Sequence, residues 1–331
     1  MNKVITLILG ILVVLGVIIL FFNIIIPGET ETKNTTTQIR YDDQTVSNWQ
    51  SPFEEVEIVS NLDDSLQKAW FLPSSSGEPM PLLVSLHTWS GNYSQFDTLA
   101  ILAKESNWNY IHPDFRGPNK TFKACCSEWA RNDIDEAIDY AIENGNVNPD
   151  KIFVVGVSGG GYAALSTYMT SRHKINKISA WVPISDLPAW YNQSKIRQNK
   201  YSEDIMNCTG SVGSLDIQIA KERSPIYWEV PARNTVLNIY AGVYDGIQGS
   251  VPITQSINFY NKIVSSLGAK DRDMVSNEEK LQLLENREPL AKFGKIGARD
   301  VCLTKEFKNI SITIFMGNHE MLPSTAFKSL H

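Results

Sequence analysis

The segment that most constrains the fold is Ile152 to Leu165, which reads IFVVGVSGGGYAAL. Four apolar residues lead into a glycine-rich turn around Ser158, and an alanine-rich run follows the turn. A short apolar run predicts a buried strand, and the run after the turn has the composition of a helix. A buried strand that passes through a tight turn into a helix is typical of an α/β fold with a mostly parallel sheet.

Short strand patterns alternate with longer helical patterns along the rest of the folded region. Helices are predicted at 133–145 and 253–267, and Ser276 with Glu279 three residues on forms a capping box that begins another helix. We predict an eight-stranded, mostly parallel sheet with helices on both faces and an antiparallel pair at its first edge. The predicted strands are 55–60, 67–72, 82–86, 109–112, 152–156, 178–184, 236–242 and 310–315.

Two longer stretches interrupt the alternation, at about 186–234 and about 268–300. Insertions at strand ends of an open α/β sheet tend to cover the binding crevice. We therefore expect both stretches to be lid-like insertions within one folded domain at 51–331.

The chain begins with an uncharged, mostly apolar run from Val4 to Ile26. At a rise of about 1.5 Å per residue this run is long enough to cross a bilayer. We predict a transmembrane signal anchor at 1–26, followed by a flexible polar tether at 27–50. Lys3 precedes the run whereas Glu29 and Glu31 follow it, which predicts a single-pass protein with its domain outside the cytoplasm, periplasmic or extracellular. Cleavage of the segment would make the protein secreted.

Charge and cysteine usage exclude some kinds of partner. The formal net charge is −6 and no segment gathers Lys and Arg, so no nucleic acid is expected to bind. The spacing of the cysteines matches no zinc pattern, and no metal or cofactor is predicted. An oxidising compartment would permit one or two disulfides, and the sequence leaves their pairing open; the cysteines are Cys125, Cys126, Cys208 and Cys302.

Ser158 lies in a G-x-S-x-G pattern between the predicted strand and the predicted helix. That context is the one a nucleophile elbow requires, in which a strained turn presents the hydroxyl at the end of the sheet. The alternative is a glycine-rich phosphate-binding turn. However, the G-x-x-x-x-G-K pattern is missing, and no acidic residue follows at the distance typical of dinucleotide sites. We therefore predict that Ser158 is a nucleophile.

A serine nucleophile needs a base and an acid that orients the base. His319 follows the last predicted strand and is the predicted base, since the histidine comes last in the chain order serine, acid, histidine. Asp245 follows the strand 236–242 and is the predicted acid. Asp186, just after the strand 178–184, is the alternative acid.

An oxyanion hole needs two N–H donors placed where negative charge develops. Gly159, directly after the serine, is predicted to supply one, and Trp89 in the loop after the strand 82–86 is predicted to supply the other, with Thr88 as the alternative. His87 in the same loop is expected to brace the loop by hydrogen bonding rather than to transfer protons.

Together, DFRGPN (Asp114 to Asn119), VNPDKIFVVGVSGGGYAAL, YDGIQGSVP and GNHE resemble the catalytic domain of the prolyl oligopeptidase family of α/β-hydrolases. They also resemble the related acetyl xylan esterases and cephalosporin deacetylases. The resemblance runs from about Ser51 to the C-terminus and implies that Ser158, Asp245 and His319 form the triad. Trp89 matches the aromatic residue of the family's oxyanion loop. Thr88 and Pro118 depart from the esterase pattern, which has Gly and Gln there.

The resemblance implies a serine hydrolase that works through an acyl-enzyme. We expect esters to be preferred over peptides, because the roughly 50 residues before the fold cannot form the β-propeller that limits peptide length in full prolyl oligopeptidases. A carbohydrate ester is one candidate substrate, and other small molecules or short peptides are further candidates. Five aromatic residues near the first insertion are candidates for stacking on sugar rings: Trp181, Trp190, Tyr191, Tyr227 and Trp228. The alternatives are that these aromatics only pack the lid, that the chain is a serine peptidase of prolyl oligopeptidase type, and that it is an inactive interaction module.

Overall fold

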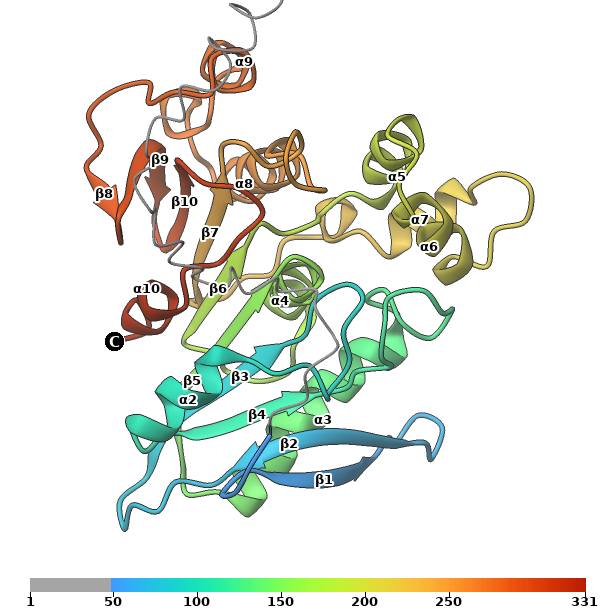
Figure 1. Ribbon diagram of the computed structural model, residues 1–331, viewed down its shortest axis with the longest axis vertical. Helices are drawn as coiled ribbons and strands as arrows, with labels where there is room; N and C mark the ends of the chain where they lie inside the picture. Colours follow the sequence, from blue (N-terminus) through green and yellow to red (C-terminus); the bar gives the residue numbers. More distant parts are fainter. Residues whose placement is uncertain (1–48) are drawn as a thin grey trace, which may run out of the picture. The chain divides into compact units, whose positions relative to one another are not determined.

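The computed structural model describes residues 49–331, and these form a ten-stranded sheet with helices on both faces (Figure 1). The strand order is β1-β2-β4-β3-β5-β6-β7-β10-β9-β8. The central strands from β4 to β10 pair in parallel, whereas β1, β2, β9 and β8 join the sheet through antiparallel pairs. Parallel pairing brings the carboxyl ends of the central strands to one edge of the sheet.

The sheet and its covering helices have the following bounds. The strands are β1 Glu54–Val59, β2 Leu66–Leu72, β3 Met80–Leu86, β4 Asn109–Pro113, β5 Val147–Val157, β6 Lys177–Trp181, β7 Val236–Gly242, β8 Lys295–Ile296, β9 Arg299–Phe307 and β10 Ile310–Phe315. The helices are α2 Thr98–Glu105, α3 Glu128–Asn144, α4 Gly159–Thr170, α5 Leu187–Ile196, α6 Tyr201–Cys208, α7 Ile217–Glu222, α8 Thr254–Ser266, α9 Asn277–Glu285 and α10 Pro323–Lys328, with short 3₁₀ turns η1 Pro225–Tyr227 and η2 Asp271–Asp273.

Alternate residues of the central strands build two cores. Val154 of β5 packs with α3, α4 and α8 on one face, while its neighbour Val155 packs with α2 and α10 on the other. Because both faces are covered, these strands are apolar almost throughout, which explains why they read as continuous hydrophobic runs in the sequence. A third apolar cluster joins Trp89 to helices α5 and α6.

The predicted fold class is confirmed, and each of the eight predicted strands is present. Strand β6 ends at Trp181 rather than at residue 184, because Val182 has a φ of +43°, which no extended strand accommodates. The capping box of Ser276 and Glu279 begins α9 as predicted.

The predicted number of strands is wrong, because β8 and β9 were missed. Residues 268–300 were expected to be an insertion, but the hairpin of β8 and β9 begins at Lys295, and β9 pairs with β10 at the far edge of the sheet. β9 lies second from the edge of the sheet, beside the two-residue β8, and is only partly covered. Its sequence RDVCLTKEF therefore mixes charged with apolar residues and lacks the continuous apolar run that marked the central strands.

The predicted anchor at 1–26 and nearly all of the predicted tether lie outside the described residues. Among residues 49–331, no helix combines the length and the apolar character that crossing a bilayer requires.

Candidate active site

Ser158 stands at the turn between β5 and α4, with φ +59° and ψ −117°. Residues with side chains rarely adopt this conformation, and a strained backbone at such a turn is the mark of a nucleophile elbow. At this turn β3, β5 and α4 approach one another so closely that side chains would not fit between them. A Cβ atom added to Gly156 would overlap the carbonyl oxygen of Gly160, and one added to Gly160 would overlap that of Leu86. The glycines around Ser158 therefore serve the geometry of the elbow.

The structure brings Asp245 and His319 together. Asp245 lies in the loop after β7 and His319 in the loop after β10, and the His319 Nδ1 atom is 2.6 Å from Asp245 Oδ2. The other carboxylate oxygen of Asp245 accepts hydrogen bonds from the backbone N–H groups of Gly246 (2.8 Å) and Val251 (3.0 Å). Because Asp245 is only 1 % exposed, these bonds hold its carboxylate in a single orientation toward the imidazole.

Sheet topology places this pair near the elbow. β5, which carries Ser158 at its end, is separated from β7 by one strand, and β10 lies directly beside β7. All three loops leave the carboxyl ends of parallel strands at the same edge of the sheet. Residues 158, 245 and 319 are thus gathered at that edge although more than 70 residues separate each from the next.

Asp186, the alternative acid, has another task in the structure. Its Oδ1 atom accepts a hydrogen bond from the Ala189 N–H (2.9 Å) and so caps the start of α5. Its Oδ2 atom accepts one from the Tyr227 hydroxyl at 3.1 Å. The carboxylate that the structure joins to His319 is that of Asp245.

The two predicted oxyanion donors are neighbours in space. A Cβ atom added to Gly159 would overlap the backbone nitrogen of Trp89, so the backbones of these two residues are in direct contact. The Gly159 N–H is at the first position of α4, where the helix offers no acceptor. Thr88, the alternative donor, has its N–H bound to Gln95 Oε1 at 2.8 Å. Of the two candidates for the second donor, Thr88 thus has its N–H already bonded, and Trp89 is the one whose backbone nitrogen lies against Gly159.

His87 braces the loop that carries Trp89. Its ring nitrogens lie 2.9 Å from the Thr88 carbonyl oxygen and 2.6 Å from that of Asp114, and the ring stacks on Phe115 at 3.8 Å. Burial lowers the pKa of His87, which keeps the ring neutral at neutral pH. The remaining histidine of this region, His112, is also buried and its pKa is lowered to about 3. Both rings are therefore buried and neutral at neutral pH.

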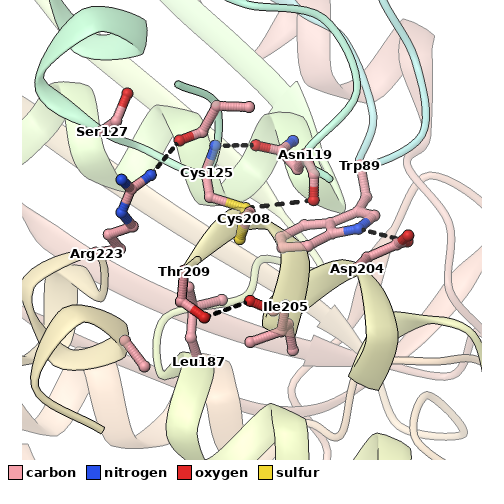
Figure 2. The surroundings of a disulfide bond; sticks show 12 residues. Trp89, Asn119, Cys125, Ser127, Leu187, Asp204, Ile205, Cys208, Thr209 and Arg223 are labelled. Atoms are coloured by element: carbon pink, nitrogen blue, oxygen red, sulfur yellow. Dashed lines mark hydrogen bonds between the residues drawn. A yellow bond between two sulfur atoms is a disulfide. The ribbon is translucent and has the colours of Figure 1, made fainter. Parts of the chain in front are cut away.

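The disulfide left open by the sequence joins Cys125 to Cys208 (Figure 2). Cys126 and Cys302 are free and buried. It connects the loop after β4 to helix α6 across 83 residues of sequence. No spacing rule predicts this pairing, because it depends on the tertiary contact between two segments that are distant in the chain.

The geometry also identifies Gly249 as a functional position that sequence reasoning missed. A Cβ atom there would lie 2.5 Å from the His319 Cβ and would overlap the Asp245 carboxylate. A glycine shortly after a predicted triad acid was the only available signal, and nothing in the sequence said that the loop folds back onto the pair.

Comparison with known proteins shows the family. The model of the Prolyl oligopeptidase family matches residues 95–270, more than half of the chain. The chain belongs to the prolyl oligopeptidase family. Its sheet and covering helices have the α/β-hydrolase fold.

Curated relatives of this prolyl oligopeptidase family member are themselves uncharacterized. The chain is 31% identical to "Uncharacterized protein YfhR" of Salmonella typhi over 120 residues, which are 35% of the chain and 41% of that protein. The YfhR protein of Escherichia coli K12 is 30% identical over 111 residues, 33% of the chain and 39% of that protein. The match thus spans about two-fifths of these relatives.

Among solved structures, an acylaminoacyl peptidase in complex with Z-Gly-Gly-Phe-chloromethyl ketone has a TM-score of 0.59 at 16% identity, covering 84% of the chain and 40% of that structure. Oligopeptidase B from Leishmania major has a TM-score of 0.56 at 11% identity, covering 84% and 36%. At such low identity the likeness shows the shared α/β-hydrolase fold of the family and nothing about substrate.

Proposed function

We propose that the chain is a serine peptidase in which Ser158 is the nucleophile, His319 the general base and Asp245 the residue that orients the base, while Gly159 and Trp89 supply the oxyanion hole. The observation that carries the proposal is the Asp245–His319 contact of 2.6 Å at the sheet edge where the strained Ser158 elbow ends β5. The family match supports a peptidase over the ester hydrolase that the sequence analysis favoured.

The reaction follows from these positions. The Ser158 Oγ attacks the carbonyl carbon of the scissile bond while its proton passes to His319 Nε2, and Asp245 stabilises the imidazolium through Nδ1–H. The negative charge that forms on the carbonyl oxygen is met by the N–H groups of Gly159 and Trp89. His319 then gives its proton to the leaving amine, which departs and leaves an acyl-enzyme. Water repeats the sequence, the acid is released, and the serine regains its proton.

Two of the five aromatic residues considered for sugar stacking are unable to do so. Trp181 and Trp190 are 0% and 1% exposed. Trp181 stacks on Tyr240 at 4.1 Å, and Trp190 stacks on Tyr201 at 4.8 Å. For these two the expectation is wrong, because they pack helices and strands together and leave no ring face free for a substrate. The case for a carbohydrate ester loses its main support.

We further propose that the enzyme works outside the cytoplasm, held to the membrane by its N-terminal apolar segment. The Cys125–Cys208 disulfide supports this location, because disulfides persist in oxidising compartments. The apolar run from Val4 to Ile26 and the acidic residues after it support the anchor and its orientation. A membrane-impermeant biotinylation reagent should label the chain on intact cells, and labelling only after lysis would contradict this orientation.

The catalytic proposal is tested with the purified chain and a fluorophosphonate probe. We expect wild type to be labelled and Ser158→Ala to be unlabelled, whereas an unlabelled wild type would favour an inactive interaction module. Enzyme from the same preparation that has not been treated with the probe is then compared on blocked peptide amides, short-chain nitrophenyl esters and acetylated sugars. We expect measurable amide hydrolysis. Ester turnover with no amide turnover would contradict the peptidase assignment and leave the serine hydrolase in place.

A further inference from the structure

The loop that carries the Trp89 N–H is attached to two segments outside the central strands. The Trp89 carbonyl oxygen accepts a hydrogen bond from the Asn119 N–H at 2.8 Å. The Trp89 indole donates to Asp204 Oδ2 at 3.1 Å, and Asp204 lies on α6 (Figure 2). The backbone and the side chain of Trp89 are thus held from two directions, by the loop after β4 and by α6.

The disulfide joins these two directions. The Cys125 N–H donates to Asn119 Oδ1 at 2.8 Å, and Cys125 is bonded to Cys208 at the end of α6 (Figure 2). Cys208 follows Asp204 by four residues, so both side chains lie on the same face of the helix. The contacts therefore form a closed ring that runs from Trp89 through Asn119, Cys125 and Cys208 to Asp204 and back to the indole of Trp89.

The ring is anchored at further points. The Tyr162 hydroxyl of α4 donates to the Cys125 carbonyl oxygen at 2.9 Å, and Arg223 donates to the Ala124 carbonyl oxygen at 2.7 Å. The Trp89 indole packs edge-to-face on Trp190 with 4.7 Å between ring centroids. None of these groups lies on β5, β7 or β10, the strands whose ends lead to Ser158, Asp245 and His319.

The free thiol next to the disulfide does not compete with it. Cys126 is 5% exposed, and burial raises the pKa of its thiol to about 12. Because the thiolate is the species that attacks a disulfide, Cys126 at neutral pH is too rarely ionised to exchange with its neighbour. The bond therefore stays between Cys125 and Cys208 in spite of the vicinal cysteine.

We propose that the Cys125–Cys208 disulfide, Asn119 and Asp204 act as positioning residues for the Trp89 N–H of the oxyanion hole. The inference rests on the proposed function. The physical reason is that an oxyanion donor works only when it is held in place before the charge develops, and loss of one donor altogether reduces kcat by about 10²- to 10³-fold. Loosening the ring without removing the N–H should have a smaller effect on kcat of about tenfold.

The test uses the full chain and a small acyl substrate that the wild type turns over. The variants are Cys125→Ser with Cys208→Ser, Asn119→Ala, and Asp204→Ala paired with Asp204→Asn, which keeps an acceptor for the indole. Cys302→Ser is the matched control, because Cys302 is a free buried cysteine on β9. For each we measure kcat, KM, the inhibition constant of a peptidyl trifluoromethyl ketone, and the midpoint of thermal unfolding.

We expect kcat to fall about tenfold in the double cysteine variant, in Asn119→Ala and in Asp204→Ala, with KM little changed. The inhibition constant of the transition-state analogue should rise by a similar factor, since the same two N–H groups bind its oxyanion. Asp204→Asn should recover most of the kcat, and Cys302→Ser should match wild type.

Two results would overturn the inference. Unchanged kcat with a lowered unfolding midpoint would show that the disulfide only stabilises the fold, and raised KM with unchanged kcat would show that α6 only forms a wall for the substrate. If the double cysteine variant does not fold, the Asp204 pair decides the question, and equal kcat in both Asp204 variants would reject the inference. A wild type that neither labels at Ser158 nor turns over any acyl substrate would instead reject the proposed function, and this inference with it.

Discussion

Different interactions hold the two sides of the candidate site, the triad side with Ser158, Asp245 and His319 and the oxyanion side with Gly159 and Trp89. On the triad side, backbone groups dominate: Asp245 accepts two backbone N–H groups, and glycines permit the close approach around Ser158. On the oxyanion side, Trp89 is held by one backbone N–H, that of Asn119, and by the side chain of Asp204, and a covalent cross-link joins these two distant parts of the chain. We therefore expect substitutions on the triad side to abolish catalysis, and substitutions around Trp89 to lower kcat only in part.

The largest effect should come from Ser158→Ala and Asp245→Asn on the triad side. We expect kcat to fall by at least about 10⁴-fold in each, because serine, histidine and aspartate act as a unit. Thermal unfolding should change little in Ser158→Ala, since the substitution removes a single hydroxyl that makes no cap hydrogen bond to α4. Residual activity in Asp245→Asn within tenfold of wild type would contradict the assignment of Asp245 as the triad acid.

Gly249→Ala should disturb the triad without replacing any of its three residues. The added methyl would lie 2.5 Å from the His319 Cβ and overlap the Asp245 carboxylate, so the pair must move apart. A displacement of about 1 Å costs roughly 10²-fold in kcat. Gly77→Ala is the control, because a Cβ at Gly77 has nothing within 4 Å. Equal kcat in the two variants would show that the loop yields without disturbing the pair.

Lowering the pH should lower the free energy of unfolding through two buried histidines near the oxyanion loop. Burial lowers the pKa of His112 to about 3 and lowers that of His87 as well. In the unfolded chain a histidine has a pKa of about 6.5, so the unfolded state binds protons first as the pH falls. The stability due to the neutral His112 ring is therefore full above about pH 6.5 and is lost between there and about pH 3. At pH 5 the loss due to His112 is about 2 kcal/mol, and the neutral His87 ring acts in the same direction.

Urea unfolding at pH 7.5 and pH 5 measures this loss. His112→Gln should recover about 2 kcal/mol of the difference between the two pH values, because glutamine does not bind a proton in this range. A variant with the same pH dependence as wild type would show that His112 is protonated in the folded protein.

The smallest effect should come from Asp186→Ala, a substitution that tests whether Asp186 or Asp245 is the triad acid. Asp186 caps α5, and loss of an N-cap costs about 1 kcal/mol of unfolding free energy. We expect kcat to stay within about twofold of wild type. A loss comparable to that of Asp245→Asn would move the acid from the loop after β7 to the loop after β6.

Much of the fold was predictable because its signals are local. The central strands are covered on both faces and therefore appear as apolar runs, and the elbow is a strand, a turn and a helix within 14 consecutive residues from Ile152 to Leu165. β9 was not predictable in the same way, because it is an only partly covered strand with a mixed pattern and its assignment depends on pairing with β10. The predicted roles of Ser158, Asp245 and His319 remain for the substitutions above to test.

The amino-acid sequence by itself determined the order of the eight predicted strands, the family, and the glycine-boxed serine, because these depend on residues that are neighbours in the chain. Only the tertiary structure decided that Asp245 rather than Asp186 meets His319, that Trp89 rather than Thr88 has an available N–H, and that Cys208 is the partner of Cys125. Each of these three outcomes depends on which distant segments the folded sheet brings into contact. That information is carried by packing over the whole domain, and spacing along the chain does not contain it.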